Sequence, residues 1–225
     1  MRIRALPYLI FFLAPAATAA DFAVGGSVGT LGLGAELTAG LGTQVNLRVG
    51  AHGGSYDDRR VADDIEYDAT AEVRAGTALL DWHPGGGSFR LSGGAVFNGN
   101  EVEGESLPPA SGFYEIGDVQ VPVALLGTLN GKVEWDSVAP YAGLGFGNPF
   151  GGDGGWSFGL DLGVIFQGEP QVTLTPVFSP GSPLDNPVGR ALLRTQLDEE
   201  ERNLEEEFSD FDLYPVLAFG VSYRF

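Results

Sequence analysis

Hydrophobic and polar residues alternate with a period of two in the C-terminal third of the chain. In the segment 156–167, Trp156, Phe158 and Leu160 begin an apolar series at every second position, and mostly small or polar residues lie between them. The segment 217–225 repeats this alternation. A helix would scatter such a series around its circumference, whereas a strand places alternate residues on opposite faces. Both segments are therefore predicted to be β-strands with one apolar face.

Six more segments alternate in the same way, with turn-forming residues or longer polar links between them. The tightest breaks lie at Leu41-Gly42-Thr43, at Pro84 and the three glycines after it, and at Asp136. Each segment is near the ~9–11 residues that a tilted strand needs to cross a bilayer, or longer. The predicted fold is therefore an all-β, antiparallel transmembrane barrel of eight strands. Its first six strands are placed at 31–40, 44–50, 65–82, 89–98, 119–135 and 141–147.

The connection 168–210 breaks this pattern and is rich in proline. Asn186 followed by Pro187 is typical of a helix N-cap with proline at the first helical position. Apolar residues then recur at helical spacing, at Leu193, Leu197, Leu204, Phe208 and Phe211. An amphipathic helix is therefore predicted at 187–208. Two hypotheses remain open: the leucines pack on the barrel rim while the glutamates face water, or the helix forms a lid or plug over the lumen.

Residues 1–20 have the features of a secretory signal peptide. Arg2 and Arg4 form a positive start, a short apolar run follows, and Ala17 and Ala19 provide a small-residue cleavage site. The apolar run is too short to span a bilayer as a helix. Cleavage would leave 21–225 as one mature barrel domain that contains the helical insert.

The composition fits a barrel and excludes several other classes. Hydrophobic residues make up 44% of the chain, yet no mature segment holds 18 consecutive apolar residues, which excludes a helical membrane protein. The 35 glycines suit a narrow, strongly curved sheet. A net charge of −18 opposes nucleic-acid binding, which needs basic residues to neutralise phosphates. Without cysteine there is no disulfide, thiolate chemistry or cysteine-linked lipid anchor.

The C-terminus carries a pattern of its own. Apolar and aromatic residues end the chain at every second position, at Phe219, Val221, Tyr223 and Phe225. This resembles the C-terminal insertion signal of bacterial outer-membrane proteins, and the whole of 21–225 resembles the small eight-stranded barrels of the OmpA-like and OmpX-like type. The resemblance implies a location in the outer membrane, contact with its lipids and with the barrel-insertion machinery during assembly, and a monomer.

The predicted direction of the chain through the membrane conflicts with the usual placement of short turns and long loops in these barrels. Eight crossings place both termini on one side, in the periplasm. The tight turns at Leu41, Pro84 and Asp136, and the helix, would then lie outside the cell, whereas such barrels have short turns inside and long loops outside. Either this barrel breaks the rule, or a strand has been merged or missed. The segments 22–29 and 171–178 are the places where that can have happened.

The inward-facing set of the predicted strands contains charges of both signs. An eight-stranded barrel is too narrow for an open channel, so its side chains fill it. Two hypotheses remain: an internal network of ion pairs, which buried charges require, or a selective ion path along those charges. The predicted lumen charges are Glu36, Arg48, Glu72, Arg74, Arg90, Lys132, Glu134, Asp161 and Arg224.

Catalytic and metal-binding groups are sparse. Barrel lipid-A deacylases use a serine, a histidine and an acid, and here His52 with Ser55 and with Glu36 or Glu72 is the one such combination that can be imagined. A lone loop histidine explains His52 and His83 more simply. Four aspartates cluster at Asp57, Asp58, Asp63 and Asp64, but they lack the calcium-loop pattern and are interpreted as a solvated acidic loop. No metal or cofactor is expected.

These observations favour a non-enzymatic barrel that serves the envelope structurally or as an interaction surface. The alternative is a narrow pore, or a barrel that binds a small apolar or amphipathic molecule, gated by the helix at 187–208. The contents of the lumen distinguish the two. Ion pairs favour the first, and an apolar cavity favours the second.

Overall fold

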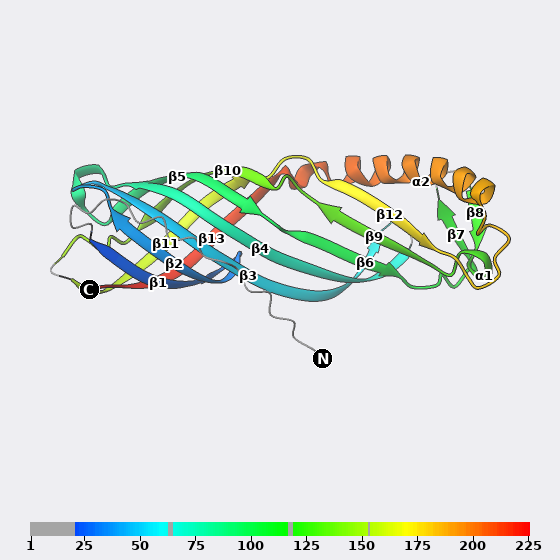
Figure 1. Cartoon of the computed structure of the whole chain (residues 1–225), viewed down its shortest axis with the longest axis horizontal. Coiled ribbons are helices and arrows are strands. Elements are labelled where there is room, and N and C mark those ends of the chain that lie inside the picture. The colour runs from blue at the N-terminus through cyan, green and yellow to red at the C-terminus, as the bar shows by residue number, and fades with distance from the viewer. Residues whose placement is uncertain (1–20, 63–64, 117–118, 153) are drawn as a thin grey trace.

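The computed structural model describes residues 21–62, 65–116, 119–152 and 154–225, with the side chains of 56–69 left out (Figure 1). The predicted signal peptide lies outside the described residues, so its cleavage stays a prediction. Within the described part, no helix is both long enough and apolar enough to cross a membrane.

Eight antiparallel strands close into a barrel, which confirms the predicted fold class. The first strand, β1, pairs with β2 on one side and with the last strand, β13, on the other. The ring is completed where β5 pairs with both β4 and β10. In order around the barrel, the strands are β1 (Phe22–Gly29), β2 (Gly32–Gly40), β3 (Val45–Ala62), β4 (Ile65–Trp82), β5 (Phe89–Asn98), β10 (Val138–Phe146), β11 (Gly155–Phe166) and β13 (Leu213–Arg224).

The outer wall of the barrel is an apolar belt. Leu162 at the middle of β11 is exposed, whereas its neighbour Asp161 is buried inside. Aromatic residues gather at the end that carries the C-terminus, where the Tyr223 ring contacts Trp156 and Phe225 edge-on, with centroids 5.1 and 5.4 Å away. An apolar band bordered by aromatic residues is typical of a barrel wall that faces lipid.

Two long strands, β3 and β4, continue beyond the closed barrel, where three further strands extend the same sheet (Figure 1). The pairing of β2 with β3 ends at Gly53, while β3 and β4 stay paired along their full length. Past the barrel, β4 pairs with β6 (Glu101–Ser106), which pairs with β9 (Thr128–Glu134), which pairs with β12 (Gln171–Val177). We call this part of the sheet and the elements packed on it the extension.

The extension has a hydrophobic core of its own. Its sheet is covered by a hairpin of β7 (Phe113–Ile116) and β8 (Val119–Pro122), by the short α1 (Val123–Leu126) and by α2 (Pro187–Glu207). The fully buried side chains of this core include Tyr114, Ile116, Leu126, Leu129 and Leu197. Two single-turn 3₁₀ helices complete the fold: η1 (Pro84–Gly86) between β4 and β5, and η2 (Ser209–Asp212) before β13.

The helix α2 begins as the sequence predicts. The Asn186 side-chain oxygen accepts hydrogen bonds from the backbone N–H groups of Val188 and Gly189, at 3.0 and 3.1 Å. These bonds satisfy donors that the first helical turn leaves free, and Pro187 costs no bond at that position. The predicted helix at 187–208 is confirmed to within one residue.

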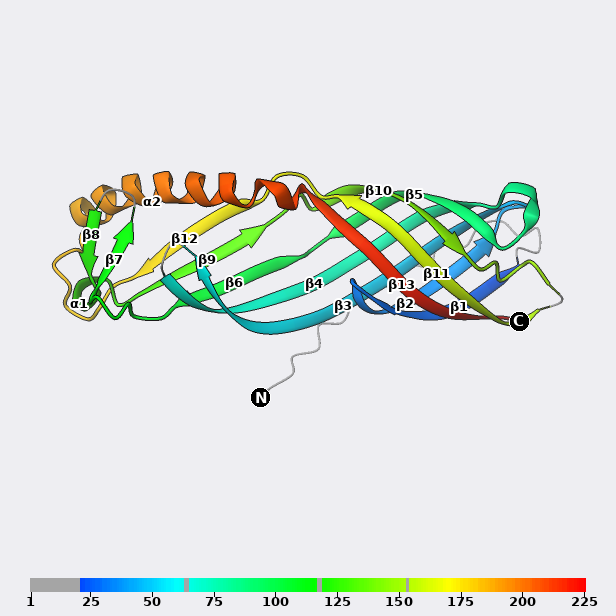
Figure 2. The ribbon, with the colours of Figure 1, turned by 180° about the vertical axis from the view of Figure 1, so that it is seen from behind.

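The position of α2 differs from both hypotheses for it. The helix lies along the extension, beyond the closed barrel, in both views (Figures 1 and 2). Its buried leucines join the extension core rather than the barrel rim or the lumen. Two of its glutamates also turn inward: Glu201 accepts a hydrogen bond from the Leu174 backbone N–H at 2.7 Å, and Glu205 one from Val172 at 3.0 Å. These carboxylates cap the edge of β12, whose free N–H groups would otherwise invite another strand.

Two corrections resolve the conflict over chain direction. The predicted strand at 119–135 is not a barrel strand, because it divides into β8, α1 and β9, with a reversal at Gly127 (φ +74°). The segment 22–29 is the barrel strand that the prediction omitted, and 171–177 is a strand of the extension. The turns at 41–44, 83–88 and 147–152 therefore lie at the end that carries the C-terminus, and the long connections lie at the other end, together with the two-residue turn at 30–31.

Candidate functional site

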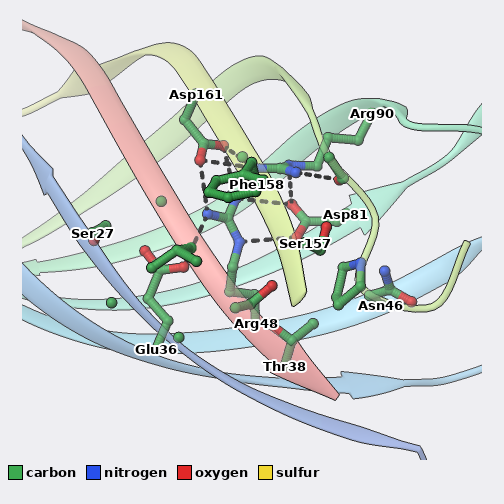
Figure 3. Close-up of a pocket in the computed structure, with 18 of the residues that line it drawn as sticks. Ser27, Glu36, Thr38, Asn46, Arg48, Asp81, Arg90, Ser157, Phe158 and Asp161 are labelled. Atoms are coloured by element: carbon green, nitrogen blue, oxygen red, sulfur yellow. Dashed lines mark hydrogen bonds and ion pairs between the residues drawn. The ribbon is translucent and has the colours of Figure 1, made fainter. Parts of the chain in front are cut away.

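The barrel interior is filled by two layers of side chains. Near the extension, the layer is apolar and contains Leu31, Leu79, Val96, Tyr141, Ile165 and Val216. Nearer the C-terminal end, the layer is polar and is built around Arg48 and Arg90 (Figure 3). A continuous polar path through the lumen would have to cross the apolar layer.

The polar layer is a network of ion pairs that joins four strands. Arg48 on β3 donates from Nε and Nη2 to the two carboxylate oxygens of Asp81 on β4, at 2.9 and 3.1 Å. It also donates from both terminal nitrogens to Asp161 on β11, at 3.2 and 3.1 Å. Arg90 on β5 donates to the same Asp161 at 2.7 and 2.8 Å. Buried charges are tolerated where they are paired and hydrogen-bonded in this way.

Glycines make room for these side chains. A Cβ on Gly163 would lie 2.3 Å from the Tyr141 hydroxyl oxygen, and one on Gly145 would lie 2.8 Å from Arg90 Nε. These positions need glycine because a large side chain on a neighbouring strand occupies the space of a Cβ. The high glycine content therefore serves the packing of a narrow lumen.

The structure brings together four of the nine predicted lumen charges: Glu36, Arg48, Arg90 and Asp161. The prediction missed Asp81 because it assigned the two faces of β4 the wrong way round. Placing Glu72 and Arg74 in the lumen put Val73 and Leu79 on the outer face, but both are buried inside, and Leu80 and Trp82 face outward. Both faces of β4 are apolar in the barrel, so alternation alone did not distinguish them. In the sequence, the position of Asp81 between the apolar residues Leu80 and Trp82 could have indicated that Asp81 faces inward.

Four other predicted lumen charges lie outside the barrel, on the outward face of the extension. Lys132 contacts Glu134 at 3.0 Å and Glu101 at 3.1 Å, and these hydrogen bonds raise the pKa of its ammonium. Arg74 forms ion pairs with Glu72 and, at 3.8 Å, with Glu101. Glu72 and Arg74 were misplaced because the faces of β4 were reversed, and Lys132 and Glu134 because β9 belongs to the extension and not to the barrel.

The ninth predicted charge, Arg224, is half-buried at the end of β13. Its strand register places it opposite Gly155 and Ala23, far along the barrel from Asp161, which pairs with Ala218. The predicted insertion-signal residues Phe219, Val221, Tyr223 and Phe225 all lie exposed on the outer wall. That placement suits recognition from outside, and the role itself stays a prediction.

The imagined deacylase set is not assembled. His52 faces the lumen, where its Nε2 lies 3.9 Å from Glu36 and 3.4 Å from the Thr77 hydroxyl. Ser55, three residues further along β3, lies on the opposite face, paired with Glu72. Odd and even residues of one strand point in opposite directions, so His52 and Ser55 do not meet.

His83 is a structural residue of the turn after β4. Its Nε2 accepts a hydrogen bond from the Asn46 side-chain amide at 3.0 Å, so its Nδ1 carries the proton and donates to the Gly87 carbonyl at 3.0 Å. Burial lowers the pKa of His83 below its ordinary value. Of the four clustered aspartates, Asp63 and Asp64 lie outside the described residues, and Asp57 and Asp58 lie in β3 with side chains that are not described.

Two small cavities flank the network. One has a volume of about 40 Å³ and lies on the C-terminal side, and the other has about 30 Å³ and lies towards the apolar layer. Both are lined by Ser27, Glu36, Arg48 and Asp161, so these residues separate them. Each holds only a few water-sized groups. Neither is lined by a residue of α2.

The comparisons with known proteins agree with this architecture. Neither a protein-family model nor a curated protein sequence matches the chain. Among solved structures, CarO2 of Acinetobacter baumannii aligns over 92% of this chain and 98% of its own, with a TM-score of 0.56 and 20% identity. CarO of the same organism aligns over 91% of this chain and 97% of its own, with a TM-score of 0.52 and 19% identity. The chain therefore shares its overall fold with these two proteins.

Proposed function

We propose that this protein is an integral outer-membrane barrel with a non-enzymatic role, and that the barrel anchors the extension outside the cell as an interaction surface. The apolar belt supports the membrane location. The short turns at the C-terminal end support an orientation with both termini in the periplasm, since such barrels have short turns on that side.

The filled lumen supports a role other than transport. Arg48 and Arg90 tie β3, β4, β5 and β11 together across the interior, and the apolar layer lies between this network and the extension. The two cavities are too small for a drug-sized or lipid-like ligand, which needs a pocket of roughly 300 Å³ or more. The helix α2 packs on the extension sheet, so it does not supply the gate that a pore would use.

The observation that carries the proposal is the extension itself. It has its own buried core and projects past the apolar belt. Among the described side chains, its outward face is strongly acidic, with Glu72, Glu101, Glu103, Glu105 and Glu134 against Arg74 and Lys132. Such a face repels anionic surfaces and keeps the extension away from lipid phosphates.

The orientation can be tested with single cysteines, because the chain has none of its own. Gln120→Cys places an exposed thiol on the β7–β8 hairpin, and Thr43→Cys places one on the turn between β2 and β3. A membrane-impermeant maleimide added to intact cells should label the first variant and not the second. If Gln120→Cys is labelled only after the outer membrane is permeabilised, the extension does not lie outside the cell and the proposed orientation is wrong.

The closed lumen can be tested by conductance in a planar bilayer. The purified barrel should show no steady channels, and removing 187–208 with a flexible linker in its place should not create them, because α2 does not cover the lumen. Regular channels in the intact protein would favour a pore. Channels that appear only after the deletion would restore the gate hypothesis.

A further inference from the structure

The strands of the barrel end at different heights on the side of the extension, and this leaves strand edges without a partner strand. The pairing of β1 with β13 stops at Gly29, and the pairing of β2 with β3 stops at Gly53. A further edge belongs to β12, the last strand of the extension. An unpaired edge presents a row of backbone N–H and C=O groups that can pair with another strand. Proteins usually cover such edges, so an edge without cover is a candidate binding site.

The edges of β13 and β12 are covered. On β13, the Thr30 hydroxyl donates to the Pro215 carbonyl at 3.1 Å and accepts from the Leu217 backbone N–H at 3.2 Å. On β12, the glutamates of α2 accept hydrogen bonds from two backbone N–H groups of the edge. Pro215 and Pro176 have no N–H at all, so neither edge is a good template for another strand.

The edge of β3 at residues 54–62 has a different character. It contains no proline, and no strand of the described part of the chain pairs with it. The glutamates of α2 do not serve this edge, because β3 runs along one border of the extension and α2 along the opposite border (Figures 1 and 2). We call residues 54–62 of β3 the open edge.

The direction of the backbone groups along the open edge follows from the paired part of β3. Leu41 donates its N–H to the Val45 carbonyl at 2.9 Å, so the odd-numbered residues of β3 turn their backbone groups toward β2. The register of β3 with β4 is uninterrupted from Val45 to Ala62. The odd-numbered residues of the open edge therefore turn their N–H and C=O groups away from β4, to the side that has no partner strand.

We propose that the open edge binds an extended, basic segment of another protein, which joins the sheet as an additional antiparallel strand. In this mode of recognition, main-chain hydrogen bonds provide the affinity and alternate side chains provide the specificity. The inference rests on the proposed role of the extension as an interaction surface, and it names the class of partner that this surface takes.

The charge of the sheet favours a basic partner. A strand added beside β3 continues the outward face of the extension, where the described side chains are mostly glutamates. The open edge joins this face directly, since Ser55 pairs with Glu72 of β4. Charged residues at positions 57–60 of the edge oppose pairing with an apolar strand. Lysine or arginine at alternate positions of the added strand would complement the acidic face.

A second copy of this chain does not fit the open edge. Two copies in one membrane are related by a two-fold axis along the membrane normal, so β3 of both copies would rise from the membrane in the same direction. Every pairing of the large sheet among the described residues is antiparallel. An antiparallel strand at this edge must run back toward the membrane, which suits a segment of a different protein.

The test uses the purified barrel with its extension in detergent micelles. The probe is a fluorescent synthetic peptide that alternates lysine with threonine over the length of the open edge, and its binding is followed by fluorescence anisotropy. Two matched peptides carry N-methyl groups, one on the lysine amides and the other on the threonine amides. Odd-numbered residues of β3 lie on the outward face, so lysines on that face must use their own N–H groups to pair with β3. Methylation of the lysine amides should abolish binding, and methylation of the threonine amides should preserve it.

A pair of variants tests the position of the added strand. Asp57→Pro removes an N–H of the open edge and no hydrogen bond to β4, so it should raise the dissociation constant of the probe roughly tenfold. Asp57→Asn removes the same charge and keeps the N–H, so it should bind the probe more tightly than Asp57→Pro does. A peptide with glutamate in place of lysine should bind the wild type more weakly than the probe does.

Four outcomes would overturn the proposal. They are no saturable binding of the probe, equal binding of the two methylated peptides, equal binding by Asp57→Pro and Asp57→Asn, and binding of the glutamate peptide that matches or exceeds that of the probe. If Asp57→Pro does not fold, the two methylated peptides decide. The peptide assays do not depend on orientation in the membrane, so their failure is distinct from a failure of the Gln120→Cys labelling.

Discussion

The outward position of Leu162 makes the depth of the barrel in the membrane measurable. Leu162 is 44% exposed and lies on β11 between Trp156 at one end and Phe166 at the other. A strand tilted by about 40° rises about 2.5 Å per residue along the membrane normal. Leu162 therefore lies about 15 Å from the level of Trp156 and about 10 Å from that of Phe166. These distances place it near the middle of an apolar band of about 25 Å.

Replacing Leu162 with arginine should lower the free energy of unfolding by about 2–4 kcal/mol, because the charge must lie at the bilayer midplane. The matched control is Leu213→Arg at the start of β13, which is 47% exposed and pairs with Phe166 at the edge of the band. The control should cost about 0–1 kcal/mol. The measurement is urea unfolding of barrels folded in lipid vesicles, followed by circular dichroism. Equal costs at the two positions, or a cost below about 1 kcal/mol at Leu162, would refute the assignment of this wall to lipid.

Three further predictions concern other parts of the molecule. Deleting Phe225 should reduce the amount of assembled, heat-modifiable barrel while secretion across the inner membrane continues; unchanged assembly would remove the residue from the insertion signal. Leu197→Ala should cost about 2–5 kcal/mol in the extension core, so limited proteolysis should cut the extension and spare the barrel; simultaneous loss of both would show one cooperative unit. The lowered pKa of His83 gives stability that is present above its unfolded pKa of about 6.5 and is lost as the pH falls through the folded value. His83→Gln should weaken that pH dependence, and an unchanged dependence would exclude the residue as its source.

The sequence was sufficient for most of the barrel and for α2, because both depend on local periodicity. Lipid on one side and a packed lumen on the other impose alternation on strands such as β11 and β13, and an N-cap such as Asn186 fixes the start of a helix. The extension was not foreseen, since β6, β9 and β12 are strands whose partners are set by tertiary packing. The alternation at 119–135 predicted one continuous strand, but the chain reverses at Gly127. A local pattern does not show where such a reversal lies.

Part of the candidate site was equally accessible and part was not. Glu36, Arg48, Arg90 and Asp161 alternate with clearly apolar neighbours, so their direction follows from the period alone. Asp81 was missed because the lumen beside it is apolar as well, and alternation is ambiguous when both faces of a strand are apolar. Glu72 was placed inward by the same ambiguity. The displacement of Lys132 to the outside has another cause: its strand lies where the barrel has ended, and strand length alone does not show where a sheet closes.

The filled lumen constrains how the protein reaches its final position. In the proposed orientation, the extension must travel from the periplasm to the cell surface, and its segments are parts of the chain between β3 and β13. A folded barrel whose interior is crossed by Arg48 and Arg90 leaves no passage for them. The extension must therefore be translocated before β13 pairs with β1, while the sheet is still open. Pairing of β13 with β1 is then the step that fixes the topology of the protein in the membrane. The strand that makes this last pairing is the one that ends in Phe225.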